Sequence, residues 1–304
     1  MTPARLALVV AVLAAPVGAE VPTVVADIPP VQSLAAAVME GVGEPALLLP
    51  PGASPHDVSL RPSEARALSR AEVVFTVGEA LSPALAGAIA AAPEEATVVA
   101  LLDVPGTRLH ETAEHEAAGH EAGHAAGDGH DHGVVDPHAW LDPVNAQLWL
   151  AAMADTLGRR DPGNAEAYAA NAGRAAAAVG RAAAEAQALL QPVRGQPVVV
   201  LHDAFTYWQE AFGMPRPLAI AASDAAQPGP AHLSALRRRM AAEGITCIMA
   251  EPQFDAKLVA LVAEGSGARI GMWDPLGSGL EPGPGLYPAL LTALARAYAG
   301  CASG

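Results

Sequence analysis

The stretch NAEAYAANAGRAAAAVGRAAAEAQALL, residues 164–190, decides the fold that this sequence predicts. It contains no proline and is dominated by alanine, the strongest helix former, so it predicts one helix about 40 Å long. Apolar runs alternate with helical patterns on both sides of it, at 21–28 and 71–77 before it and at 197–201 and 245–250 after it. Because these runs are apolar throughout, we expect parallel strands that are buried on both faces. The prediction is an α/β fold: two lobes with mainly parallel sheets, bridged by one long helix.

Residues 1–19 have the pattern of a secretory signal peptide. Arg5 precedes an apolar run at 6–15, and small residues at 17–19 offer a cleavage site. The run is too short to cross a bilayer, which takes about 20 residues. We therefore expect an exported chain with no membrane insertion after signal removal. Its expected parts are an N-terminal α/β lobe at 20–162, a linking helix at 163–191 and a C-terminal α/β lobe at 192–304.

The charge balance narrows the classes of partner. The 304 residues include 17 Lys and Arg against 32 Asp and Glu, a formal net charge of -15. Nucleic-acid binding depends on Lys and Arg contacts to phosphates, so we expect no nucleic-acid partner. The same charge argues against adhesion to an anionic membrane surface. An apolar content of 52% excludes a wholly disordered chain, and the length is sufficient for two domains.

The chain has two cysteines, Cys247 and Cys301. Thiols of exported proteins tend to oxidise, and neither cysteine has a Cys or His neighbour at chelating spacing. A disulfide is therefore favoured over a metal site. It would tie the C-terminal tail to a strand and stabilise the fold by about 4 kcal/mol through the entropy of the unfolded chain.

Four side chains that can bind a metal stand at the ends of apolar runs or loops in the two lobes: His56, His138, His202 and Asp274. Ligands of open α/β sheets bind at the carboxyl ends of strands, so we expect these four to meet in the cleft between the lobes. Three imidazoles and one carboxylate suit tetrahedral Zn²⁺. Taken singly, each histidine is also compatible with a surface or capping role. Glu251, at the end of another run, is a candidate to support the site rather than to bind the metal.

A segment rich in His, Glu, Ala and Gly interrupts the α/β pattern at residues 110–132. We predict a loop that collects zinc with low affinity and passes it to the buried site, the alternative being a solvated insert with incidental binding. An H-E-x-x-H pattern at 120–124 matches zinc proteases, but the glycines around it break the helix that such a motif requires. The six candidate histidines of the loop are His110, His115, His120, His124, His130 and His132.

Five motifs carry a resemblance to a known family. In order and spacing they resemble the zinc-specific solute-binding proteins of bacterial ABC importers, the ZnuA type, from about residue 22 to the C-terminus. The His-rich segment before the second motif is itself typical of the zinc members. The motifs are GASPHDVSLRPSEA (52–65), DPHAWLDP (136–143), LHDAFTYW (201–208), AEPQFD (250–255) and WDPLG (273–277).

The resemblance implies a periplasmic protein of two α/β lobes joined by one long helix. It implies that His56, His138 and His202 bind Zn²⁺, with Asp274 or a water as the fourth ligand, and that a disulfide lies in the C-terminal lobe. Its partners would be an ABC permease and its ATPase. We expect a monomer that performs no chemical step. Imidazole must be neutral to bind zinc and its ordinary pKa is about 6.5, so zinc affinity is expected to fall below about pH 6.

Three other functions fit the same residues. A manganese- or iron-binding protein of this fold is the first, although three histidines favour zinc over metals that prefer oxygen donors. A secreted zinc hydrolase is the second, and it would need an open coordination position and a general base, for which no residue stands out. A zinc buffer or adhesin without a transporter is the third.

Overall fold

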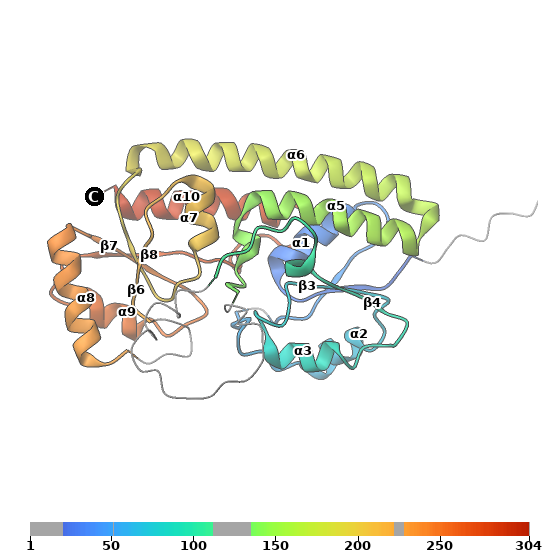
Figure 1. Cartoon of the computed structure of the whole chain (residues 1–304), viewed down its shortest axis with the longest axis horizontal. Helices are drawn as coiled ribbons and strands as arrows, with labels where there is room; N and C mark the ends of the chain where they lie inside the picture. Colours follow the sequence, from blue (N-terminus) through green and yellow to red (C-terminus); the bar gives the residue numbers. More distant parts are fainter. Residues whose placement is uncertain (1–20, 51, 112–134, 222–227, 304) are drawn as a thin grey trace, which may run out of the picture.

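The computed structural model describes residues 21–50, 52–111, 135–221 and 228–303. The predicted signal peptide and the His-rich segment beyond residue 111 lie outside the described residues. Within them, two lobes stand side by side under one long helix (Figure 1). No helix of the described ranges has the length and apolar character needed to cross a membrane.

The N-terminal lobe is built on a four-stranded parallel sheet in the order β2-β1-β3-β4. Alternate residues of its strands face opposite sides, as the period of a strand requires. Val24 and Ala26 pack with the helices above the sheet, and Val25 packs with those below it. Figure 1 shows α1 and α5 on the first side and α2 and α3 on the second. The elements are β1 (Val24–Ala26), α1 (Pro29–Val38), β2 (Ala46–Leu47), α2 (Pro62–Leu68), β3 (Val73–Thr76), α3 (Pro83–Ile89), β4 (Thr97–Ala100) and the 3-10 turn η1 (Leu101–Asp103).

The C-terminal lobe repeats this design with a parallel sheet in the order β6-β5-β7-β8. Helices α8 and α9 cover one face of its sheet with a small apolar cluster, and α7 and α10 cover the other. The elements are β5 (Val199–Val200), α7 (Thr206–Phe212), β6 (Leu218–Ala219), α8 (Pro230–Glu243), β7 (Cys247–Ala250), α9 (Lys257–Ala263), β8 (Arg269–Met272) and α10 (Leu286–Ala302).

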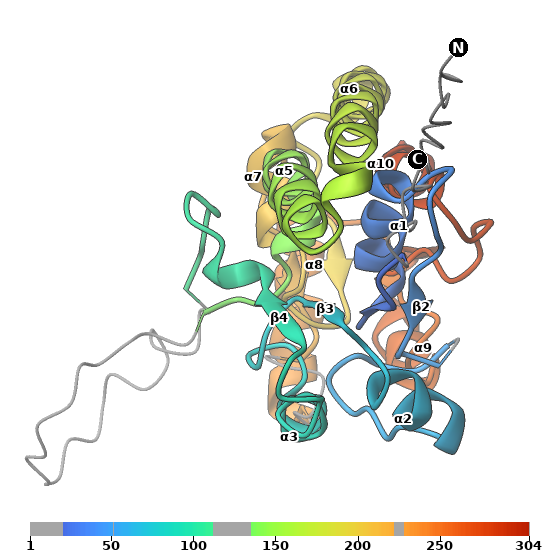
Figure 2. The ribbon, with the colours of Figure 1, turned by 90° about the vertical axis from the view of Figure 1, so that its right-hand side faces the viewer.

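Helix α6 (Ala165–Leu190) is the predicted long helix, and it lies inside the expected range 163–191. It packs on α5 (Pro143–Arg160) at one end and on α10 at the other, which Figures 1 and 2 show from two sides. One apolar cluster runs from α1 and α5 through α6 into α7 and α10. The α/β prediction is therefore confirmed, and both lobes share one continuous core. The 3-10 turns η3 (Pro162–Asn164) and η4 (Gln191–Val193) flank α6, and η2 (Ala139–Leu141) precedes α5.

The predicted disulfide is present between Cys247 in β7 and Cys301 in the last turn of α10. It ties the C-terminal helix to the sheet, as the sequence analysis expected. Helix α2 was not anticipated, because its seven residues show too little periodicity. It begins at Pro62, whose missing N–H suits the first turn of a helix. The side chain of Glu64 then accepts a hydrogen bond from the backbone N–H of Arg61 (2.6 Å).

Candidate metal centre

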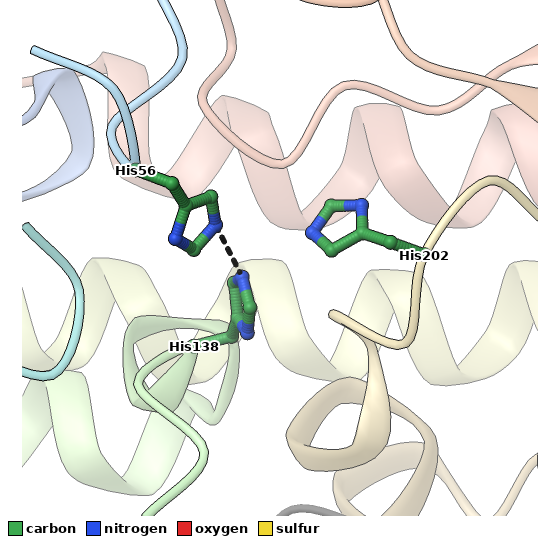
Figure 3. Close-up of side chains that lie close together, drawn as sticks. All are labelled: His56, His138 and His202. Atoms are coloured by element: carbon green, nitrogen blue, oxygen red, sulfur yellow. Dashed lines mark hydrogen bonds between the residues drawn. The ribbon is translucent and has the colours of Figure 1, made fainter. Parts of the chain in front are cut away.

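His56, His138 and His202 meet between the two lobes (Figure 3). One ring nitrogen from each lies within 4.8 Å of the other two, and the Nε2 atoms of His56 and His138 are 3.2 Å apart. Among the described residues this is the one group of His, Cys, Asp or Glu with the spacing to hold a metal ion. A small cation that accepts several nitrogen ligands is the species that such a convergence fits.

Each histidine is carried by a separate loop. His56 follows β2, in a loop that the buried Ser82 holds by donating a hydrogen bond to the carbonyl of Pro55. His138 directly precedes η2. His202 follows β5, at the carboxyl end of a parallel strand where ligands of such sheets bind. The first two loops belong to the N-terminal lobe and the third to the C-terminal lobe.

A buried carboxylate orients each of the two more buried histidines. Oδ1 of Asp136 lies 2.7 Å from Nδ1 of His138 and also accepts a hydrogen bond from its backbone N–H (3.0 Å). Oε1 of Glu251 lies 2.9 Å from Nδ1 of His202. Carboxylates in this position fix the tautomer of an imidazole, so that Nε2 is left as the metal ligand. Both carboxylates are about as buried as the histidines they contact, with 3% of their surface exposed.

The three imidazoles face a small cavity of about 10 Å³, the space of one water-sized group. Its walls are mainly apolar and come from both lobes. The ring of Phe254 packs edge-on against His202 at 5.4 Å, and Trp140 packs on His138 at 5.3 Å. The remaining wall residues are Pro55, Glu251, Gln253, Pro275 and Leu276. Walls of this kind exclude water and leave room for an ion rather than for an organic ligand.

Asp274, the candidate fourth ligand, lies outside the three-histidine group. Its carboxylate organises the turn after β8, where it accepts hydrogen bonds from the backbone N–H groups of Leu276 (3.0 Å) and Ser278 (2.5 Å). It also accepts one from Nε2 of Gln253 (2.8 Å). The expectation that Asp274 joins the histidines is corrected on this point. An aspartate at the end of a strand can serve the backbone of the following turn as readily as a metal.

The histidines of the His-rich segment have different outcomes. His110 packs against α7, with its ring 4.4 Å from that of Tyr207 and its Nε2 3.3 Å from Oε2 of Glu210. Glu111 then pairs with Val135 in an isolated antiparallel bridge, which brings the two ends of the segment together. His115, His120, His124, His130 and His132 lie outside the described residues, and their zinc-collecting role stays a prediction.

A family model described as ZnuA, zinc-uptake complex component A periplasmic, matches residues 24–301. The chain belongs to the ZnuA family. The motifs that suggested this family are the same ones that build the site: DPHAWLDP supplies both His138 and its partner Asp136, and AEPQFD supplies Glu251 and Phe254.

Relatives in the ZnuA family align over nearly the full length of both chains. A high-affinity zinc uptake system protein ZnuA of Paracoccus denitrificans (strain Pd 1222) is 42% identical, over 95% of this chain and 94% of the relative. Those of Brucella suis biovar 1 (strain 1330) and Yersinia pestis are 37% and 34% identical, over 92% and 91% of this chain and 91% and 90% of theirs.

Solved structures similar to this chain share its fold. A crystal structure of ZnuA has a TM-score of 0.77 at 22% identity, over 91% of this chain and 98% of the other. A protein of Pseudomonas aeruginosa in complex with Mn²⁺ has a TM-score of 0.76 at 21% identity, over 92% of this chain and 98% of the other. Since proteins of this fold are described with different metals, the metal must be inferred from the side chains of the site.

Asp136 and Tyr207 were not among the residues predicted for the site. The signal for Asp136 was local, because a residue two positions before a histidine in a tight turn can reach its Nδ1 atom. Tyr207 is a buried aromatic residue, and the sequence alone does not distinguish it from other residues of the core. Its hydroxyl contacts residues 97 and 71 positions away, which no local pattern reveals.

Proposed function

We propose that this chain is the periplasmic zinc-binding protein of an ABC importer. It captures Zn²⁺ between its lobes and delivers it to a permease, whose ATPase drives uptake. The observation that carries the proposal is the convergence of three imidazoles from both lobes in a member of the ZnuA family. It acts as a monomer and binds its cargo without a chemical step.

In this proposal His56, His138 and His202 hold the ion through their Nε2 atoms. The contacts of Asp136 and Glu251 with the Nδ1 atoms support this choice of atom for the last two. The two carboxylates also bring negative charge near a divalent cation, which favours binding in a site shielded from water. Water completes the coordination, because Asp274 is held by Gln253 and by backbone N–H groups.

The donor set favours zinc over manganese. Imidazole suits Zn²⁺, whereas Mn²⁺ prefers carboxylate, carbonyl and water oxygens. A hydrolase of the same residues would need a general base at the open coordination position. The carboxylate of Asp136 is not part of the cavity wall, and that of Glu251, which is, contacts the outer nitrogen of His202. Binding and transfer are therefore favoured over catalysis.

The test is a chelator-competition titration with Zn²⁺ and Mn²⁺ on the metal-free chain from Glu20 onward. In a second protein a two-residue Asn-Gly turn replaces residues 112–134, so that Glu111 and Val135 can still pair as an antiparallel bridge. We expect one tight zinc site in both proteins and no competition from Mn²⁺ at equal concentration. Loss of the tight site on deletion would place it in the His-rich segment and reject the three-histidine site.

Single variants locate the site within the chain. His202→Ala removes one proposed ligand, and His232→Ala is its control, because His232 lies exposed on α8. Tight zinc binding should be lost in the first variant and unchanged in the second. Equal binding by both would contradict the assignment of His202.

A further inference from the structure

Tyr207 stands where both ends of the His-rich segment meet the C-terminal lobe. It lies in the first turn of α7 and is fully buried. Its hydroxyl accepts a hydrogen bond from the backbone N–H of His110 (3.0 Å) and donates one to the carbonyl of Asp136 (2.8 Å). One phenol of the C-terminal lobe therefore holds the chain before the segment and the chain after it.

The direction of these hydrogen bonds is fixed by chemistry. A backbone N–H can only donate, and a carbonyl can only accept. Burial raises the pKa of Tyr207 above its usual range, so the phenol keeps the proton that it donates to Asp136. The ring of His110 packs on that of Tyr207, and its contact with Glu210 adds a second attachment to α7. The hydroxyl thus serves two partners that lie nowhere near it in the sequence.

Asp136 connects these hydrogen bonds of Tyr207 to the metal centre. Its backbone N–H donates to the carbonyl of His110 (2.8 Å), and its carbonyl accepts from the hydroxyl of Tyr207. Its Oδ1 contacts the backbone nitrogen and the Nδ1 atom of His138. An aspartate side chain is short, so the position of its backbone determines where the carboxylate points. The carboxylate in turn orients the imidazole of His138.

The hydrogen bond between Tyr207 and Asp136 also fixes the position of His138 relative to His202 in the opposite lobe. Helix α7 begins at Thr206, four residues after His202, and the loop between them contains buried Ala204 and Phe205. A displacement of Asp136 from α7 therefore changes the position of His138 relative to His202. Metal ligands must be placed closely to bind tightly, so such a displacement lowers affinity even where every ligand is still present.

We propose that Tyr207 is a positioning residue of the metal centre, whose hydroxyl holds Asp136, and through it His138, in register with the lobe that carries His202. This inference rests on the proposed function, since it concerns the affinity of the same three-histidine site.

The test begins with Tyr207→Phe, which removes the hydroxyl and keeps the ring that packs on His110. Tyr298→Phe is the matched control, because Tyr298 is another buried tyrosine of the C-terminal lobe whose hydroxyl donates to a backbone carbonyl, that of Gln196. Changing the partner of a metal-binding histidine weakens binding about 10- to 100-fold, and Tyr207 acts one step further out, so we expect about a tenfold loss of zinc affinity. The control should change by less than about twofold.

A double-mutant cycle separates positioning from a general loss of stability. If Tyr207 acts through Asp136, the double variant Asp136→Ala/Tyr207→Phe, in which the side chain that contacts His138 is removed, binds zinc no more weakly than Asp136→Ala alone. The effects of Tyr207→Phe and Glu251→Gln, which act on different ligands, should instead add. Co²⁺ in place of Zn²⁺ gives a spectroscopic measurement, because its absorption reports the ligand geometry. The spectrum should change in Tyr207→Phe and not in Tyr298→Phe.

Two results overturn the positioning role: unchanged zinc affinity in Tyr207→Phe, or a loss that adds fully to that of Asp136→Ala. The wild-type protein in the same titration reports on the proposed function. Tight binding by the wild type together with either of these results rejects the role of Tyr207 alone, whereas a wild type without a tight site rejects the proposed function.

Discussion

Replacing Glu251 by glutamine tests whether buried negative charge helps the site to bind zinc. Glu251 is 3% exposed, and its Oε1 contacts Nδ1 of His202 at 2.9 Å. Its Oε2 is buried and has no hydrogen-bond partner among the described residues. Glutamine has nearly the same shape and can still accept the hydrogen bond from His202. The substitution therefore removes the charge and leaves most of the packing in place.

Two effects of opposite sign are expected from Glu251→Gln. Outer partners of metal-binding histidines contribute about 10- to 100-fold to affinity, so zinc binding should weaken by about 1.4 to 2.7 kcal/mol. The metal-free protein should gain stability of about 1 kcal/mol, because a buried, incompletely bonded carboxylate costs more than a neutral amide. A variant that binds less tightly while its metal-free form unfolds at higher denaturant is the signature of a carboxylate placed there for the metal.

The assay combines chelator competition for zinc affinity with urea unfolding of the metal-free protein. Asp255→Asn is the control, since Asp255 is an exposed carboxylate of the same loop that pairs with Lys257. The reasoning is refuted if Glu251→Gln keeps wild-type zinc affinity within about twofold, less than any outer-partner effect of this kind. An equal loss in Asp255→Asn would show that the charge of the whole loop matters and not the contact with His202.

Three further outcomes follow from other parts of the molecule. Burial raises the pKa of Asp27 from 3.8 to about 6, so the folded chain holds this proton better than the unfolded chain does. The stabilisation by this proton is present below about pH 4 and is lost as the pH rises to about 6. Over that range the free energy of unfolding of the metal-free wild type should fall by about 3 kcal/mol relative to that of Asp27→Asn, as measured by urea unfolding. Replacing both cysteines by serine should lower the free energy of unfolding by about 4 kcal/mol in the same assay. Zinc affinity measured by chelator competition should stay near that of the wild type, because the disulfide joins β7 to α10 away from the cavity. Zinc affinity of the wild type should fall below about pH 6, since imidazoles must be neutral to bind, and a flat affinity across this range in competition titrations would contradict a three-histidine site.

Much of the fold follows from local patterns in the sequence. The apolar runs that became β1, β3, β5 and β7 are buried on both faces, and this is why they carry no alternation that could be mistaken for a surface strand. Helix α6 was predicted from composition alone, because its sequence is long enough to favour a helix over any alternative. Helix α2 escaped prediction, since its start depends on Pro62 and Glu64 rather than on periodicity.

The metal-binding residues could be predicted where a single side chain of suitable chemistry follows a strand or lies in a loop. His56, His138 and His202 could be identified, and the structure brings them together. Asp274 could not be assigned by the same reasoning, because its position in the chain is compatible both with a metal and with the turn that it organises. That choice depends on Gln253, which reaches it from another loop. A contact such as that between Gln253 and Asp274 depends on how the two loops pack, and no periodic pattern in the sequence reveals it.

The linking helix alone predicts that the lobes move little, and the contacts around the cavity give a stronger reason. Nε1 of Trp140, two residues after His138, donates to the carbonyl of Pro275 in the opposite lobe (2.9 Å). The hydroxyl of Tyr287 donates to the carbonyl of Trp140 (2.5 Å), and its backbone N–H donates to Oγ of Ser33 (2.9 Å). These bonds are buried, so opening the lobes would expose an apolar core and break several hydrogen bonds, each with a net worth of about 1 kcal/mol.

Zinc must nevertheless enter and leave the cavity. The cost of separating the lobes makes movement of a ligand loop the less expensive route, because a loop can shift without breaking the shared core. His56 is the least buried of the three histidines, and its loop is held by the hydrogen bond from Ser82 and by Val58, which packs in the core. His138 and His202 are each held by a buried carboxylate. Entry and exit of zinc are therefore expected on the side of His56, the least buried of the three ligands.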